Sequence, residues 1–177
     1  PNGTPGEVWT GNTAVKFNGG DGTKDNPYQI ATGEQLLKMV LDAASEGTYY
    51  KQTYDIKLND TSNPDWKNDA RNWVWNNNIF KGNFDGAGHT ISGLYYDGEN
   101  SKVGLFPYAA NATIKRIIVS DAFIRSTGFG TGALVGDANS GTVKIIECYA
   151  TETVSVESTH SKTGEKGAGG FVGYGGA

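Results

Sequence analysis

Residues 90–96 read TISGLYY, and the segments 113–119 (TIKRIIV) and 142–148 (TVKIIEC) repeat the same pattern of apolar and polar side chains. Internal repetition shows which parts of a chain are structurally equivalent, so it guides the architecture better than any single segment does. Aligned by their first residues, the three copies place apolar side chains in three columns: Ile91, Ile114 and Val143; Leu94, Ile117 and Ile146; and Tyr96, Val119 and Cys148.

A second motif follows each copy of the first: VGLF at 103–106, GALVG at 132–136 and GGFVG at 169–173. A unit built from such short strands cannot bury its own apolar side, but stacked units share one interior. The recurrence therefore predicts an all-β fold, a parallel β-helix (solenoid) in which each strand pairs with its equivalent in the next turn. A β-sandwich of hairpins is the alternative, but it gives no reason for two motifs to recur in the same order.

Glycine makes up 26 of the 177 residues, about twice its usual share of roughly 7 %. Glycine readily adopts positive φ, which tight corners between strands often require. We therefore expect the glycines of the second motif, Gly104, Gly132, Gly136 and Gly173, to lie at corners with positive φ.

The segment 32–46 has the apolar spacing of a helix, with one stripe formed by Leu36, Leu37, Val40, Leu41 and Ala44. Thr32 is suited to cap its N-terminus, and Gln35 is suited to return the hydrogen bond. Gly47 is expected to end it. An open solenoid end would expose unpaired strand edges, so we expect this helix to cover the N-terminal end, lying across a first strand at 49–58.

The segments FNGGDGT (17–23), NPYQI (26–30) and EQL (34–36) resemble the N-terminal cap of bacterial right-handed β-helix surface proteins. FKGNFDGAGHTISGL (80–94), followed by the copies of the second motif, resembles the GLUG-motif repeats of that group. The resemblance implies a right-handed β-helix and an extracellular location, secreted or on the bacterial cell surface. Similar proteins include adhesins, non-catalytic parts of surface peptidases, and cell-wall or cellulosome-associated modules.

The expected organisation has three parts: residues 1–16 as a linker or edge segment, 17–58 as a cap with helix 32–46 and the first coil, and 59–177 as β-helix coils. Because the last residues stop within a repeat, we expect the array to continue beyond residue 177. Flanking domains of the same polypeptide are then expected partners.

Composition excludes several other functions. The chain carries 19 acidic and 15 basic side chains, for a net charge of -4, which argues against a nucleic-acid partner. No apolar run approaches the roughly 20 residues that span a bilayer, so membrane insertion is not expected. Cys148 is the single cysteine, and the two histidines lie far apart in sequence; a soft-ligand metal site is therefore not expected, and Cys148 is interpreted as a small buried thiol.

Tryptophan gives the strongest functional signal. All four tryptophans precede the regular repeats, and three of them lie in or beside an Asn-rich irregular segment. Sugars stack their less polar faces on aromatic rings, while amides pair with the hydroxyl groups. The candidate carbohydrate-binding residues are Trp66, Trp73, Trp75, Asn76, Asn77 and Tyr95, with Asn78 beside them. The structural alternative is that Trp73 or Trp75 closes the coil.

Two other chemistries are weighed against structural explanations. Calcium could bind the oxygen ligands of Asp21 and Asp25 with Asn26, although an Asx turn explains the same residues. A polysaccharide lyase or glycoside hydrolase could use Asp85 with His89, or Arg116 as a base, yet Asp and Gly at 85–89 are also ordinary turn formers. No catalytic residue is therefore assigned.

Together these observations predict a non-catalytic extracellular module, either adhesive or carbohydrate-binding, that binds a polysaccharide or cell-surface glycan by aromatic stacking on a rigid β-helix. A polysaccharide-degrading enzyme and a pure structural spacer are the alternatives.

Overall fold

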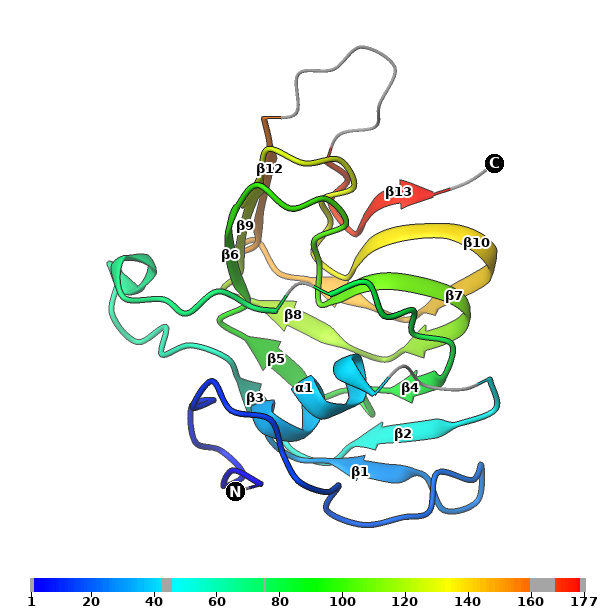
Figure 1. The fold of residues 1–177 in the computed structure, drawn as a ribbon. Helices are drawn as coiled ribbons and strands as arrows, with labels where there is room; N and C mark the ends of the chain where they lie inside the picture. The colour runs from blue at the N-terminus through cyan, green and yellow to red at the C-terminus, as the bar shows by residue number, and fades with distance from the viewer. Residues whose placement is uncertain (1, 43–45, 75, 160–167, 176–177) are drawn as a thin grey trace.

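The computed structural model describes residues 2–42, 46–74, 76–159 and 168–175, which form a right-handed parallel β-helix with one helix at its N-terminal end (Figure 1). The first sheet has the strand order β1 (Tyr28–Ile30), β2 (Tyr49–Gln52), β4 (Asn83–Asp85), β7 (Phe106–Lys115), β10 (Val135–Ile146) and β13 (Val172–Gly175). The second has the order β11 (Tyr149–Ala150), β8 (Ile118–Ser120), β5 (Thr90–Ser92) and β3 (Ile56–Lys57). The third has the order β12 (Ser155–Ser158), β9 (Phe123–Ser126) and β6 (Tyr95–Gly98).

Each turn of the chain contributes one strand to each sheet, in the successions β4-β5-β6, β7-β8-β9 and β10-β11-β12. Every pair of neighbouring strands is parallel, so each strand hydrogen-bonds to its equivalents in the turns before and after it. The solenoid prediction is confirmed. Alternate side chains of each strand point inward, and they form the core shared by all turns.

The predicted columns of the first motif are wrong, although stacked columns exist. Ile91 belongs to the second sheet, whereas Ile114 belongs to the first. Val143 is paired with Ala112 and lies two residues out of register with Ile114. The observed columns are Tyr50, Phe84, Ile114 and Ile145; Ile56, Ile91, Val119 and Ala150; and Tyr96, Ile124 and Val156.

Two physical reasons explain this error. The three strands of a turn have similar apolar spacing, so the sequence pattern does not distinguish Ile91 of the second sheet from Ile114 of the first. In addition, β7 and β10 contain register shifts near Ser140, and a displacement of two residues leaves the inward and outward pattern unchanged. Cys148 consequently lies outside the predicted column: it is half-buried, with its Sγ 3.4 Å from the carbonyl oxygen of Ile146.

The second motif stacks as its recurrence predicts. Val103 bridges to Thr131, which bridges to Ala168, and Phe106 pairs with Val135, which pairs with Val172. The expected positive φ is wrong for these glycines, since none of Gly104, Gly132, Gly136 and Gly173 has it. They are required for another reason: a Cβ added at Gly136 would lie 2.3 Å from the backbone carbon of Lys102, so glycine allows the turns to approach closely.

Helix α1 (Gly33–Leu41) is shorter than the predicted 32–46. Thr32 is the N-cap, and its side chain accepts a hydrogen bond from the Gln35 amide. Gln35 Oε1 in turn accepts from the Ala31 amide, one residue before the expected partner. At the other end, the Leu41 carbonyl accepts a hydrogen bond from the Asn78 side chain, which satisfies one of the carbonyls that a helix end leaves free. Ala44 lies outside the described residues.

The N-terminal segment covers the outer side of α1. Val8 forms a parallel bridge with Lys57 beside the second sheet, and the Ala14 amide donates to the Glu34 carbonyl. Glu34 is only 3 % exposed, and its Oε1 accepts hydrogen bonds from both the amide and the hydroxyl of Thr10. Burial raises the pKa of Glu34, but the hydrogen bonds to its carboxylate, with those from Thr10 the largest, together leave the pKa lowered. An ionised carboxylate therefore fastens this segment to the helix.

Candidate functional site

Aromatic rings occupy the outer face of the third sheet. Tyr95 of β6 and Phe123 of β9 are paired positions, and their rings stack with centroids 5.8 Å apart and planes inclined by 25°. The neighbouring residues Tyr96 and Ile124 are buried, so strand alternation directs Tyr95 and Phe123 outward. Both rings are half-buried and together form an apolar strip across two strands.

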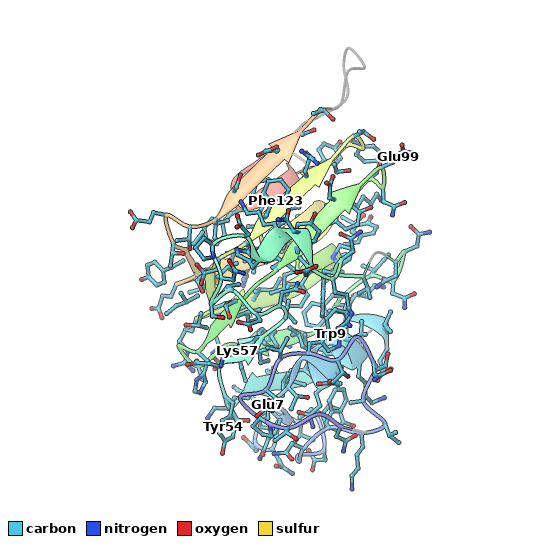
Figure 2. The ribbon with its side chains drawn as sticks, turned by 90° about the vertical axis from the view of Figure 1, so that its left-hand side faces the viewer. Glu7, Trp9, Tyr54, Lys57, Glu99 and Phe123 are labelled. Carbon is cyan, nitrogen blue, oxygen red and sulfur yellow. The ribbon has the colours of Figure 1, made fainter. Side chains whose placement is uncertain are left out.

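The irregular segment before β4 folds back over this strip and adds Trp66. Its short 3₁₀ helix η1 (Trp66–Asn68) places the Trp66 ring edge-on to Tyr95, with centroids 5.9 Å apart. Asn72 holds the segment in place, because its side chain accepts from the Asp97 amide and donates to the Asp97 carbonyl. Figure 2 shows η1 lying against the sheet beside the labelled Phe123. We call Trp66, Tyr95 and Phe123 the aromatic face.

Charged side chains border the aromatic face. Lys67 Nζ lies 4.7 Å from the centroid of the Phe123 ring, and the Arg125 guanidinium lies 5.5 Å from it. Arg125 also pairs with Asp97 through both carboxylate oxygens. Hydrogen bonding from Arg125 lowers the pKa of Asp97, so this carboxylate is ionised at neutral pH. The border thus offers both donors and acceptors to a polar ligand.

The structure brings together two of the predicted residues, Trp66 and Tyr95. Trp73 is wrong as a binding residue: it is 3 % exposed, its Nε1 donates to the Leu105 carbonyl, and its ring packs edge-on against Trp9 at 5.1 Å. It therefore plugs the coil, which was the structural alternative. The predicted Trp75 lies outside the described residues.

The asparagines lie beyond Trp73 in the segment that leads to β4. Asn77 is exposed, and Asn76 is half-buried with its Oδ1 accepting from the Asn78 amide. Asn78 itself donates to the Leu41 carbonyl of the helix. The described hydrogen bonds of Asn76 and Asn78 therefore stabilise the turn and the helix end. These hydrogen bonds do not involve the aromatic face.

Phe123 is the site residue that sequence reasoning missed. A signal for it exists: residues 94–98 (LYYDG) and 122–126 (AFIRS) both place an aromatic ring after a buried apolar residue, and an acidic and a basic side chain then follow at equivalent positions. The separation of 28 residues matches the turn length, as between Ile91 and Val119. Aligning the third-sheet strands with each other would have revealed the pair.

Asp85 and His89, the candidate catalytic pair, interact with different residues and not with each other. Asp85 pairs with Arg116 through both carboxylate oxygens and with Lys115 at 3.3 Å, while His89 Nδ1 lies 3.2 Å from Asp55. Asp85 Oδ1 also accepts from the Ala87 amide, as expected for an Asx turn. Burial raises the pKa of Asp85, but hydrogen bonds from Arg116 and Ala87 and the charge of Lys115 leave it lowered.

A glycosidase acid needs the opposite shift, because it must hold its proton near neutral pH. Among the described residues, every carboxyl group with a resolved pKa shift is shifted downward: Asp21, Glu34, Asp60, Asp85 and Asp97. These groups are suited to ion pairs and hydrogen bonds rather than to proton donation.

The proposed calcium ligands form a turn. Asp21 Oδ1 accepts hydrogen bonds from the amide and the hydroxyl of Thr23, which is the geometry of an Asx turn. Within the described residues, His, Cys, Asp and Glu side chains do not gather in any group of three able to hold a metal ion. Calcium binding at Asp21 and Asp25 stays a prediction.

Comparison with known proteins gives distant relatives and no family. No family model matches the chain, and no solved structure matches it. The chain is 30% identical over 156 residues to halomucin of Haloquadratum walsbyi. The matched region covers 87% of this chain and 2% of halomucin. It is 30% identical over 141 residues to a putative Gly-rich membrane protein of Evansella cellulosilytica, covering 77% of this chain and 16% of that protein. The chain thus spans only a small part of each relative. Across the described residues, no helix has the length and apolarity needed to cross a membrane.

Proposed function

We propose that this domain is a non-catalytic carbohydrate-binding module of a bacterial cell-surface protein and that its aromatic face binds glycan. The observation that carries the proposal is the row of Trp66, Tyr95 and Phe123 on the outside of a rigid sheet. Neighbouring strands are about 4.8 Å apart, so rings on consecutive turns suit consecutive units of an extended sugar chain. The backbone positions of Tyr95 and Phe123 are fixed by the ladder and need no ordering when ligand binds.

Lys67 is part of this proposal. Its ammonium group lies over the Phe123 ring, where a sugar would stack. The side chain is exposed and belongs to the surface segment, so a ligand displaces it at little cost, since an exposed cation–π contact is worth about 0.5–1 kcal/mol. Arg125 and Asp97 stay in place as a bidentate pair and supply hydrogen-bonding groups to sugar hydroxyls.

The surface location is supported by the relatives of the chain. One relative is named a membrane protein, and both relatives are far longer than this chain. A module of this kind in a long protein would act beside flanking domains of the same polypeptide and gain avidity from repeated weak contacts. An adhesive role follows from that arrangement.

Retention on insoluble cellulose, chitin and xylan tests the aromatic face. We expect the wild-type domain to be retained on at least one of these polymers, and Trp66→Ala to weaken that binding by about tenfold or more, since central aromatic contacts dominate such interfaces. Lys67→Ala should retain or increase binding, because it uncovers the ring. Tyr54→Ala is the matched control: Tyr54 is 53% exposed and lies on another part of the surface (Figure 2). Equal retention of Trp66→Ala and wild type, or no retention of wild type on any of the three, would refute the proposal.

A further inference from the structure

A groove of about 240 Å³ crosses the outer face of the first sheet, on a different side of the solenoid from the aromatic face. Three of the side chains that line it are lysines, Lys24, Lys51 and Lys115, and the carboxylate among them is Asp85. Three cations in one groove contrast with the net charge of -4 on the whole chain.

The ladder arranges these charges in a row across the strands. Lys51 of β2 pairs with Asp85 of β4, which pairs with Lys115 of β7. The preceding residues Tyr50, Phe84 and Ile114 are buried in the core, so the row points outward. Lys24 extends it from the loop before β1. Because neighbouring strands are about 4.8 Å apart, Lys51 and Lys115 are separated by about 10 Å.

Asp85 neutralises only part of the positive charge in the groove. That carboxylate is already paired with the Arg116 guanidinium, as well as with Lys115. The charged residues that line the groove are therefore three lysines and one aspartate, with a net charge of +2. Within the described part of the chain, neither Lys24 nor Lys51 lies within ion-pair distance of a carboxylate. Their charges are available to a ligand.

Uncharged groups lie beside the charged row. Tyr49, Asn83 and Thr113 occupy the paired outward positions two residues earlier on the same three strands, and all three line the groove. They offer an aromatic ring, an amide and a hydroxyl, which are the groups that contact sugar rings and their hydroxyls. A ligand that satisfies both rows is linear and carries an anionic group and several hydroxyls on each unit.

We propose that this groove binds a linear polyuronate, with the sugar chain running across the strands and its carboxylates on Lys24, Lys51 and Lys115. Sugar units of an extended chain are similar in length to the strand spacing, so carboxylates two units apart fall near Lys51 and Lys115, on either side of Asp85. The groove lies on the first sheet and the aromatic face on the third, so either binding proposal can be refuted without affecting the other.

Affinity electrophoresis in native gels containing polygalacturonate tests the groove. We expect the polymer to retard the wild-type domain and the retardation to fall as salt is added, because exposed charges are screened. Lys51→Glu should weaken binding by about tenfold or more, since it replaces attraction with repulsion in the middle of the row. Lys57→Glu is the matched control: it makes the same charge change at an exposed lysine of β3, on another sheet (Figure 2), and it should bind like wild type.

Fully methyl-esterified polygalacturonate keeps the sugar backbone and removes the charge, so we expect it to cause no retardation. Equal retardation by the esterified polymer, equal binding by Lys51→Glu and wild type, or absence of binding to polygalacturonate would each overturn the proposal. Stronger retardation by a single-stranded DNA oligonucleotide at equal charge concentration would also overturn it, in favour of a general polyanion surface. Trp66→Ala should leave polygalacturonate binding unchanged, which separates this groove from the aromatic face.

Discussion

Trp66 and Trp73 illustrate how one residue type takes opposite roles within one irregular segment. Trp66 is half-buried against Tyr95 on the outer face. Trp73 is 3 % exposed, and its indole nitrogen donates to the Leu105 carbonyl. The backbone between them crosses the rim of the third sheet, where the Trp73 amide donates to the Tyr95 carbonyl. Trp73 thereby enters the core, while Trp66 stays outside it.

Substitution of Trp73 should reduce stability. Trp73→Ala removes a buried ring that also packs against Trp9, and we expect it to lower the free energy of unfolding by about 3–5 kcal/mol. Trp73→Phe keeps most of the apolar contact but leaves the Leu105 carbonyl unpaired, so a smaller loss of about 1–3 kcal/mol is expected. Urea unfolding followed by tryptophan fluorescence measures both. A Trp73→Ala variant as stable as wild type, with glycan retention lost, would restore Trp73 as a binding residue.

The second motif forms an element in which glycine permits close contact between turns. Gly136 lies against the backbone of Lys102 and Val103, and Gly173 lies against the backbone of Gly130 and Thr131. The two contacts are equivalent, one turn apart. Packing of this kind is intolerant of a side chain, because the obstructing atoms belong to the backbone rather than to a flexible side chain.

A pair of glycine substitutions tests this element. Gly136→Ala would place its Cβ 2.3 Å from the Lys102 carbonyl carbon, and we expect a loss of about 1–3 kcal/mol from overpacking. Gly170→Ala is the matched control, since no atom lies within 4 Å of its added Cβ, and its φ is not positive. The two variants are compared by thermal unfolding. Equal melting temperatures would mean that the turns separate without cost and that the glycines serve another purpose.

At the scale of the whole molecule, burial decreases from the capped N-terminal end toward the last described turn. Phe84, Ile91, Ile114 and Val119 are all 0 % exposed. Ile145 and Ala150, which pair with Ile114 and Val119 in the last described turn, are partly exposed, and so is Val156, which pairs with the buried Ile124. In a solenoid each turn is stabilised mainly by its neighbours, so a turn with one neighbour is expected to open more readily than a turn with two.

Amide hydrogen exchange of the 177-residue chain measures this gradient. We expect the amides of β5 and β8 to be protected for longest and those of β11 and β12, the outermost described strands of their sheets, to exchange earlier. The physical reason is that local opening of the last turn exposes less apolar surface than opening of a central turn. Uniform protection across all four strands would instead indicate that exchange requires global unfolding.

Local chemistry in the sequence determined several features of this protein. The recurrence of the second motif among short apolar strands determined the solenoid, since only stacked turns bury such strands. Thr32 and Gln35 determined where the helix begins, because capping depends on neighbouring residues. The same sequence placed Trp66 and Tyr95 among the candidate binding residues, and the tertiary structure brought them together.

The tertiary structure decided the register between turns, which the local sequence pattern does not specify. The register between turns depends on bulges near Ser140 and on contacts between residues 28 or more positions apart, whereas a displacement of two residues preserves every inward and outward position. The burial of Trp73, the pairing of Phe123 with Tyr95 and the lysine groove all follow from that register. Each of them depends on which turn lies beside which, and a one-dimensional pattern of period two does not specify it.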